Sequence, residues 1–190
     1  MLSPNSRIAT NHKRADRRVW LNAALDVLRE RSVDGIKVVP ISNRLGLTSG
    51  SFYWHFKNIQ DLLESVLDHW EHHLTDHIVR DAQTFDGAPE DRILNLMLQV
   101  IREDAAVPDH AISVWAKSDA TAHLTFLRTV QKRFEFAKWM FEQAGFTSDD
   151  ATARGRLMVT SLMGDSSNDL KSTQGWEDII RAHWRVLVAR

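Results

Sequence analysis

The sequence contains no cysteine and only four prolines and eight glycines among its 190 residues. Without cysteine the chain can form neither a disulfide nor a thiolate metal site, and we expect a cytoplasmic protein. The scarcity of proline and glycine favours long helices over a β architecture with many turns. No apolar run approaches the roughly 20 residues that a membrane-spanning helix requires, so no membrane partner is expected. The polar residues 1–14 also lack the apolar segment of a secretory signal.

Catalytic signatures are equally scarce. The sequence has no glycine-rich phosphate-binding loop, no G-x-S-x-G nucleophile motif and no H-E-x-x-H zinc motif. We therefore predict no catalytic residues, no cofactor and no enzymatic function. A small α-helical enzyme or binding protein remains the competing class.

The net charge of −1 hides a marked asymmetry along the chain. Residues 1–58 contain ten lysines and arginines against four acidic residues, whereas residues 59–190 contain 14 against 21. A basic head joined to an acidic body is typical of a polyanion-binding module attached to a second domain. Residues 1–15 are predicted to form a basic arm with Arg7, Lys13 and Arg14. Such an arm is equally consistent with phosphate or minor-groove contacts and with a frayed end that has no function.

Apolar residues recur at three- and four-residue spacing through most of the chain, and no alternating strand pattern interrupts them. We predict an all-α fold of about nine helices, with a polar loop at 164–175. The helices are expected at 16–31, 39–45, 49–56, 58–82, 89–105, from 108 through Trp115, 121–144, from 148 through Met163, and 176–188.

The second and third of these helices flank the turn Gly46-Leu47-Thr48. Gly46 can adopt the positive φ that ends a helix, and the Thr48 hydroxyl can cap the next one. Two short helices joined by such a turn indicate a helix-turn-helix. Phe52 and Phe56 lie four residues apart and are expected to face inward. The small, hydroxyl-bearing and aromatic residues between and before them then face outward, as in a recognition helix on DNA.

The stretch Val19–Trp70 resembles the DNA-binding domain of the TetR family of bacterial transcriptional regulators. The resemblance rests on Ala23-Ala24, Leu28, Ile41, Leu45-Gly46-Leu47, Ser49-Gly50-Ser51-Phe52-Tyr53, His55-Phe56 and Leu62-Leu63. Four positions depart from the family pattern: Ser32, Lys37, Ser42 and Ile59. At Ile59 the family usually has a phosphate-binding lysine, and we expect Lys57 to substitute for it. Lys37 adds a cation near the DNA.

The resemblance implies a DNA-binding domain at 1–58 and a ligand-binding and dimerisation domain at 59–190, joined through the fourth helix. By position in the motif, Thr48, Tyr53, His55 and Lys57 are assigned to phosphates, and Ser49, Gly50, Ser51 and Trp54 to the groove. His55 is equally consistent with a structural role. We expect a repressor that binds palindromic double-stranded DNA and is released by a small effector.

One such helix covers few base pairs, so a homodimer on an inverted repeat is expected. The resemblance implies that the last two helices form its interface, with Leu157, Thr160, Ser161, Gly164, Ile180, Trp184 and Leu187 as candidates. It also implies an effector pocket among helices 4 to 8. Candidate wall residues for an apolar or aromatic ligand are Trp70, His73, His77, Met97, Ile101, Trp115, Phe126 and Trp139.

Four histidines lie on the predicted fourth helix. His69/His73 and His73/His77 have the four-residue spacing that can hold a divalent metal. No cysteine or third ligand at a diagnostic spacing accompanies them, so we predict no metal site. A metal-sensing protein that uses the His69/His73/His77 face is the alternative reading.

Overall fold

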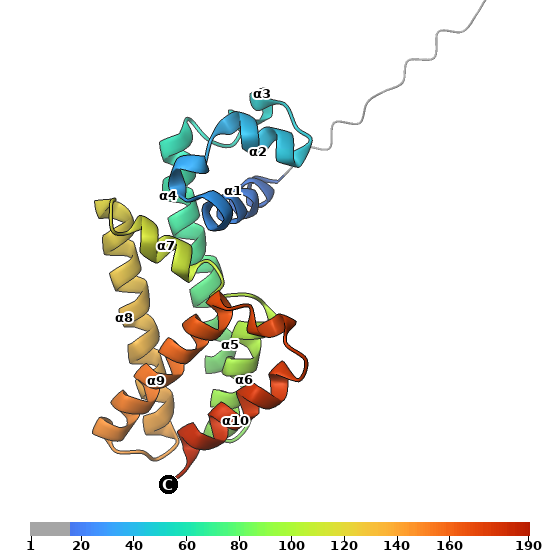
Figure 1. The fold of residues 1–190 in the computed structure, drawn as a ribbon. Helices are drawn as coiled ribbons and strands as arrows, with labels where there is room; N and C mark the ends of the chain where they lie inside the picture. The colour runs from blue at the N-terminus through green and yellow to red at the C-terminus, as the bar shows by residue number, and fades with distance from the viewer. Residues whose placement is uncertain (1–15) are drawn as a thin grey trace, which may run out of the picture.

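The structure of the chain, a computed structural model, describes residues 16–190 (Figure 1). All regular elements among these residues are helical, so the predicted all-α fold is confirmed. The basic arm predicted at residues 1–15 lies outside the described residues.

The first helices form a small unit at one end of the molecule, with α3 farthest from the C-terminus (Figure 1). This unit contains α1 (Arg17–Arg31), the 3-10 turn η1 (Val33–Gly35), α2 (Val38–Leu45) and α3 (Ser49–Phe52). The expectation that the third helix continues to Phe56 was wrong, because the chain tightens into a turn after Phe52. There the carbonyl oxygen of Phe52 accepts from the backbone N–H groups of both His55 (2.9 Å) and Phe56 (3.1 Å).

One continuous helix then leads out of this unit. It consists of α4 (Ile59–Asp68), the π-helical segment η2 (His69–Thr75) and α5 (Asp76–Gln83). We call residues 59–83 the linking helix. Its predicted start is confirmed: the Asn58 side chain accepts from the Asp61 backbone N–H at 3.0 Å, and Asp61 accepts from the Lys57 N–H at 2.8 Å. These reciprocal bonds satisfy two donors at the helix start.

Five further helices complete the larger unit: α6 (Pro89–Arg102), α7 (Asp109–Trp115), α8 (Ala120–Gln143), α9 (Ser148–Ser167) and α10 (Trp176–Val188). A short 3-10 turn, η3 (Leu170–Ser172), precedes α10. With the linking helix counted once, residues 16–190 form nine helices of α type, as expected. The prediction that a loop begins at Gly164 was wrong, because α9 continues to Ser167. Glycine lowers helix stability without forbidding a helix.

The linking helix belongs to two hydrophobic cores. In the first core, its residues Leu62, Val66 and Trp70 pack with α1, α3 and, from the larger unit, Ile112 and Trp115 of α7. In the second core, Ile78 and Ala82 pack with α6, α8, α9 and α10. Packing therefore changes from one core to the other between Leu74 and Ile78, some distance beyond the boundary expected at residue 58. That boundary stays a prediction about the organisation of the chain.

The larger unit depends on a close approach of α8 and α9. A Cβ atom on Gly155 of α9 would lie 2.9 Å from the Lys138 backbone nitrogen and 3.1 Å from the Ala137 carbonyl carbon of α8. Backbone atoms cannot move aside as a flexible side chain can, so glycine at this position sets the distance between the two helices.

Gly155→Ala should lower the free energy of unfolding by about 1–3 kcal/mol, because the added methyl group overpacks the contact. Gly164→Ala is the matched control, since a Cβ at Gly164 of the same helix meets no atom within 4 Å. The control should gain about 0.5–1 kcal/mol from better helix propensity. Urea unfolding of both variants at one protein concentration measures the two effects. Equal stability of the two variants would contradict the proposed close approach.

Candidate functional site

The turn between α2 and α3 is built around Gly46. Gly46 has φ 64° in the left-handed region, and its N–H donates to the Asn43 carbonyl at 3.1 Å. The next N–H, that of Leu47, donates to the Ser42 carbonyl at 2.9 Å, which completes a helix C-cap. The chain then enters α3 with Thr48 in the N-cap position, but the Thr48 side chain makes no capping hydrogen bond. The positive φ predicted for Gly46 is confirmed, whereas the capping bond predicted for Thr48 is wrong.

The inward face of α3 is anchored by two phenylalanines. Phe52 and Phe56 are buried, and Trp20 of α1 meets the Phe52 ring edge-on at a centroid distance of 5.6 Å. Burying Phe52 and Phe56 turns the residues between them outward. The Tyr53 side chain is 63% exposed and the Trp54 side chain 80% exposed.

The remaining residues assigned to DNA lie on the same short stretch. Thr48, Gly50 and Lys57 are exposed, and Ser49, Ser51 and His55 are partly buried. The Ser51 hydroxyl donates to the Thr48 carbonyl at 2.6 Å, so its donor is already used within the turn. Lys37 is exposed at the N-cap of α2. We call residues 48–57 the recognition edge. The DNA contacts assigned to these residues and to Lys37 stay predictions.

Two arginines of this unit bind other side chains of the same chain. Arg17 donates to the Ser65 hydroxyl at 2.5 Å and lies 5.1 Å from the Phe56 ring centroid, which fastens α1 to the linking helix. Arg44 makes a bidentate pair with Glu30, with both N–O distances at 2.8 Å. Among the described residues, the Lys37 and Lys57 side chains have no carboxylate partner. These two lysines therefore remain available to phosphates.

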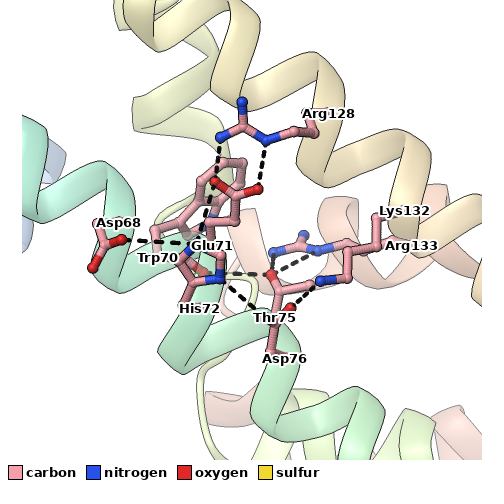
Figure 2. Close-up of polar contacts among 9 residues, drawn as sticks. All are labelled: Asp68, Trp70, Glu71, His72, Thr75, Asp76, Arg128, Lys132 and Arg133. Atoms are coloured by element: carbon pink, nitrogen blue, oxygen red, sulfur yellow. Dashed lines mark hydrogen bonds and ion pairs between the residues drawn. The ribbon is translucent and has the colours of Figure 1, made fainter.

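The middle of the linking helix is fastened to α8 by polar contacts (Figure 2). Arg128 forms a bidentate pair with Glu71, and Lys132 donates to Asp76 at 2.5 Å. Hydrogen bonding from Arg128 lowers the pKa of the nearly buried Glu71 carboxyl. The π-helical segment adds a residue to the turn, a feature frequent at functional sites. Within it, Glu71 and Thr75 both become buried.

A third contact extends this network into the interior. Arg133 donates to the Thr75 hydroxyl at 2.7 Å and to the Asp109 carboxylate of α7 at 2.5 Å. Asp109 is 1% exposed and also accepts from the Trp70 indole N–H at 2.7 Å. Burial raises the pKa of the Asp109 carboxyl, against the lowering effect of Arg133. Three elements thus meet at one buried ion pair.

A cavity lies beside this ion pair, between the linking helix, α6, α8 and α9. The space inside it that a water-sized molecule can reach is about 60 Å³. The linking helix contributes Leu74, Thr75, Ile78 and Val79 to its wall, and the other helices contribute mostly apolar side chains. Arg133 and Thr75 are the polar side chains in this wall. The cavity therefore has an apolar body and one polar end.

The helix-turn-helix region resembles that of a known family of DNA-binding proteins. Residues 21–66 match the sequence profile of the family described as bacterial regulatory proteins, tetR family. The helix-turn-helix region of the chain thus has the sequence pattern of the TetR family. Over 48 residues it is 40% identical to the class A tetracycline repressor protein from transposon 1721 of Escherichia coli. Over 84 residues it is 32% identical to the transcriptional regulator TtgR of Pseudomonas putida. These segments cover 25% and 44% of this chain and span 22% and 40% of the two relatives.

Solved structures extend the likeness to the full fold of the chain. A TetR-family regulator from Streptomyces coelicolor superposes with a TM-score of 0.72, covering 90% of this chain and 93% of the other at 15% identity. A regulator from Saccharomonospora viridis in complex with choline gives 0.69 at 16% identity, covering 90% and 94%. FadR from Bacillus subtilis in complex with stearoyl-CoA gives 0.62 at 14%, covering 92% and 98%. Identities this low show a shared fold alone.

The eight candidate pocket residues do not lie on the wall of the cavity. Trp70, Met97, Ile101 and Trp115 are buried in the cores, and Phe126 stacks on Trp70. His77 pairs with Glu103 at 3.1 Å, His73 meets His69 edge-on, and Trp139 stacks on Phe136, which does line the cavity. Helical periodicity identifies buried faces, but it does not show where side chains leave space between them.

The candidate dimer residues fall into two groups. Leu157, Thr160 and Gly164 are exposed on α9, and Ser161 is partly buried beside them. Ile180 and Leu187 of α10 are buried in the core of the same chain, and the partly buried Trp184 donates to the Glu90 carbonyl at 2.9 Å. The α9 residues are thus accessible to a second subunit, whereas Ile180 and Leu187 are enclosed within one. The interface itself stays a prediction.

The histidine face does not assemble a metal site in the part of the chain that the structure describes. His69 is buried, His77 turns to Glu103, and no group of three or more potential ligands gathers among residues 16–190. The described helices also include none that is both long and apolar enough to cross a membrane.

His69 makes the junction of the two units sensitive to acid. Its side chain is buried, with an unpartnered Nδ1, and burial lowers its pKa. Neighbouring His73, Arg18 and Arg17 also disfavour its protonation, while Asp68 favours it.

Because the unfolded chain then binds protons more readily than the folded one, His69 should lower the free energy of unfolding as the pH falls below about 6.5. His69→Phe should make the free energy of unfolding less dependent on pH between pH 5 and 8. His110→Phe, at an exposed histidine of α7, is the control. Urea titrations across this range measure the effect, and an unchanged dependence in His69→Phe would refute the assignment.

Proposed function

We propose that this TetR-family protein is a cytoplasmic transcriptional repressor that binds inverted-repeat double-stranded DNA as a homodimer. A small apolar or aromatic ligand in the cavity releases it. The main observation in support is the recognition edge, in which Phe52 and Phe56 are buried while Tyr53 and Trp54 remain exposed beside Lys57. An enzymatic role has no comparable support, since the relatives are regulatory proteins.

In this proposal the recognition edge divides its contacts between backbone and bases. Thr48, Tyr53, His55 and Lys57 bind phosphates and set the position of the helix, as such contacts generally do. Ser49, Gly50, Ser51 and Trp54 face the major groove. Ile59 is partly buried against the first core. Lys57 therefore takes over the phosphate contact that a lysine at that position makes in the family.

In this proposal the linking helix transmits the effect of ligand binding to the recognition edge. One end of it packs in the core that holds the recognition edge, and the other end forms part of the cavity wall. A ligand that fits the cavity better in one arrangement of this helix shifts the protein toward that arrangement. The spacing of two recognition edges in a dimer would change with it, and binding to a fixed operator would weaken.

Lys57→Ala should weaken binding to any duplex by a similar factor and flatten the dependence of log affinity on log salt. The slope should fall by about one unit for each lysine lost from the complex. Tyr53→Phe should also weaken binding on all sequences, because it removes one hydroxyl donor. Lys138→Ala, remote from the recognition edge on α8, is the charge-matched control. Gel shifts from 50 to 200 mM salt, on an upstream genomic fragment and on unrelated DNA, measure both. A change in sequence preference with an unchanged salt slope would overturn the phosphate assignment.

Leu157→Arg should convert the dimer to a monomer at micromolar concentration and weaken operator binding, because a charged side chain would be buried between subunits. Leu124→Arg is the matched control, since Leu124 and Leu157 are each 64% exposed on long helices of the larger unit. Light scattering of both variants provides the measurement. A Leu157→Arg protein that remains dimeric would rule out this face of α9 as the interface.

A further inference from the structure

The polar end of the cavity is chemically specific. Arg133 reaches it from α8, and Thr75 reaches it from the end of the π-helical segment. The rest of the wall is apolar and includes the methionines Met140, Met158 and Met163. Methionine side chains are flexible and polarisable, so they adapt to apolar ligands of different shapes. Selectivity in this cavity must therefore come from its polar end.

The hydrogen bonds of Arg133 leave part of its guanidinium unused. A guanidinium group has five N–H donors. The Nη1 atom donates to Asp109 at 2.5 Å, while Nη2 and Nε donate to the Thr75 hydroxyl at 2.7 and 3.2 Å. One N–H on each of Nη1 and Nη2 remains without a partner in these contacts. The side chain is only 14% exposed, so few water molecules can bind its unused N–H groups. An acceptor inside the cavity would therefore bind a donor that otherwise lacks a partner.

The charge of Arg133 is already balanced. Its partner Asp109 is 1% exposed and accepts from Arg133 at 2.5 Å, so one buried anion already faces this cation. A carboxylate or phosphate ligand would place two anions beside one cation in a poorly hydrated space. A neutral acceptor would use the free N–H groups without disturbing this balance.

We propose that the cavity binds a neutral, largely apolar molecule with one hydrogen-bond acceptor, such as a ketone, which accepts from the free N–H groups of Arg133. The inference rests on the proposed function, because it describes the effector of that repressor. The same guanidinium holds Thr75 of the linking helix. The acceptor atom of the ligand would therefore bind next to Thr75, where the linking helix forms part of the cavity wall.

The test compares two sets of three compounds that differ only at the polar group. The aromatic set is acetophenone, ethylbenzene and benzoate, and the linear set is octan-2-one, oct-1-ene and octanoate. Calorimetric titration of the full chain should show tighter binding of the ketone than of the hydrocarbon in at least one set. The expected ratio is about tenfold, since a hydrogen bond to a charged group contributes about 1.5 kcal/mol or more. The carboxylate should bind more weakly than the ketone.

Two double variants separate the role of Arg133 from general effects on the fold. Asp109→Asn with Arg133→Met removes the donor and the buried charges together, while the asparagine oxygen can still accept from Trp70. This variant should bind the ketone and the hydrocarbon equally well. Glu71→Gln with Arg128→Met removes the neighbouring ion pair between the linking helix and α8, which lies outside the cavity wall. This control should keep the preference for the ketone.

Each outcome decides a separate point. Equal binding of ketone and hydrocarbon, tighter binding of the carboxylate, or no binding of any of the six compounds would overturn the proposed ligand class. None of these results would affect DNA binding, which the salt titration of Lys57→Ala tests alone. Conversely, a ketone that binds as expected but leaves the gel shift unchanged would support the ligand class and refute ligand-induced release.

Discussion

One helix shared between two hydrophobic cores constrains the whole molecule. The linking helix packs Leu62, Val66 and Trp70 into the core that carries the recognition edge, and Ile78 and Ala82 into the core of the larger unit. Protein interiors are close-packed, so neither core can accommodate a movement of this helix without repacking. The position of the recognition edge relative to the larger unit is therefore set by how residues 59–83 are held.

The way this helix is held changes along its length. At its start, apolar contacts and the Asn58 cap fix it to the first core, and Arg17 of α1 reaches across to Ser65. In its middle, charged and hydroxyl groups replace apolar ones, and Glu71, Thr75 and Asp76 each bind a side chain of α8. Apolar burial is non-directional, whereas hydrogen bonds require a particular geometry. The polar contacts are thus placed where the linking helix passes from one core to the other.

Local sequence signals predicted the turn before the recognition edge, the burial of its two phenylalanines and the start of the linking helix. Gly46, Asn58 and the pair Phe52/Phe56 act through neighbours a few residues away, and their effects follow from backbone sterics, capping and helical spacing. The cavity and the π-helical segment could not be predicted in this way. They lie where segments far apart in the sequence meet: Arg128, Lys132 and Arg133 are each more than 55 residues from their partners Glu71, Asp76 and Thr75. The candidate wall residues Trp70 and Met97 illustrate the limit, because periodicity marked them as buried and they fill cores instead of lining space.

The polar contacts between the linking helix and α8 restrict how these two helices can move relative to each other. Glu71, Thr75 and Asp76 pair with residues 128, 132 and 133, so a shift of one helix along the other by a single residue would separate all three pairs at once. Glu71 and Asp109 are nearly buried, and an unpaired charge there is far more costly than the net gain from the pair. In the proposed function, the linking helix would therefore move between discrete arrangements and would not slide continuously. A ligand that accepts from Arg133 would touch this interface directly, since the same guanidinium binds Thr75.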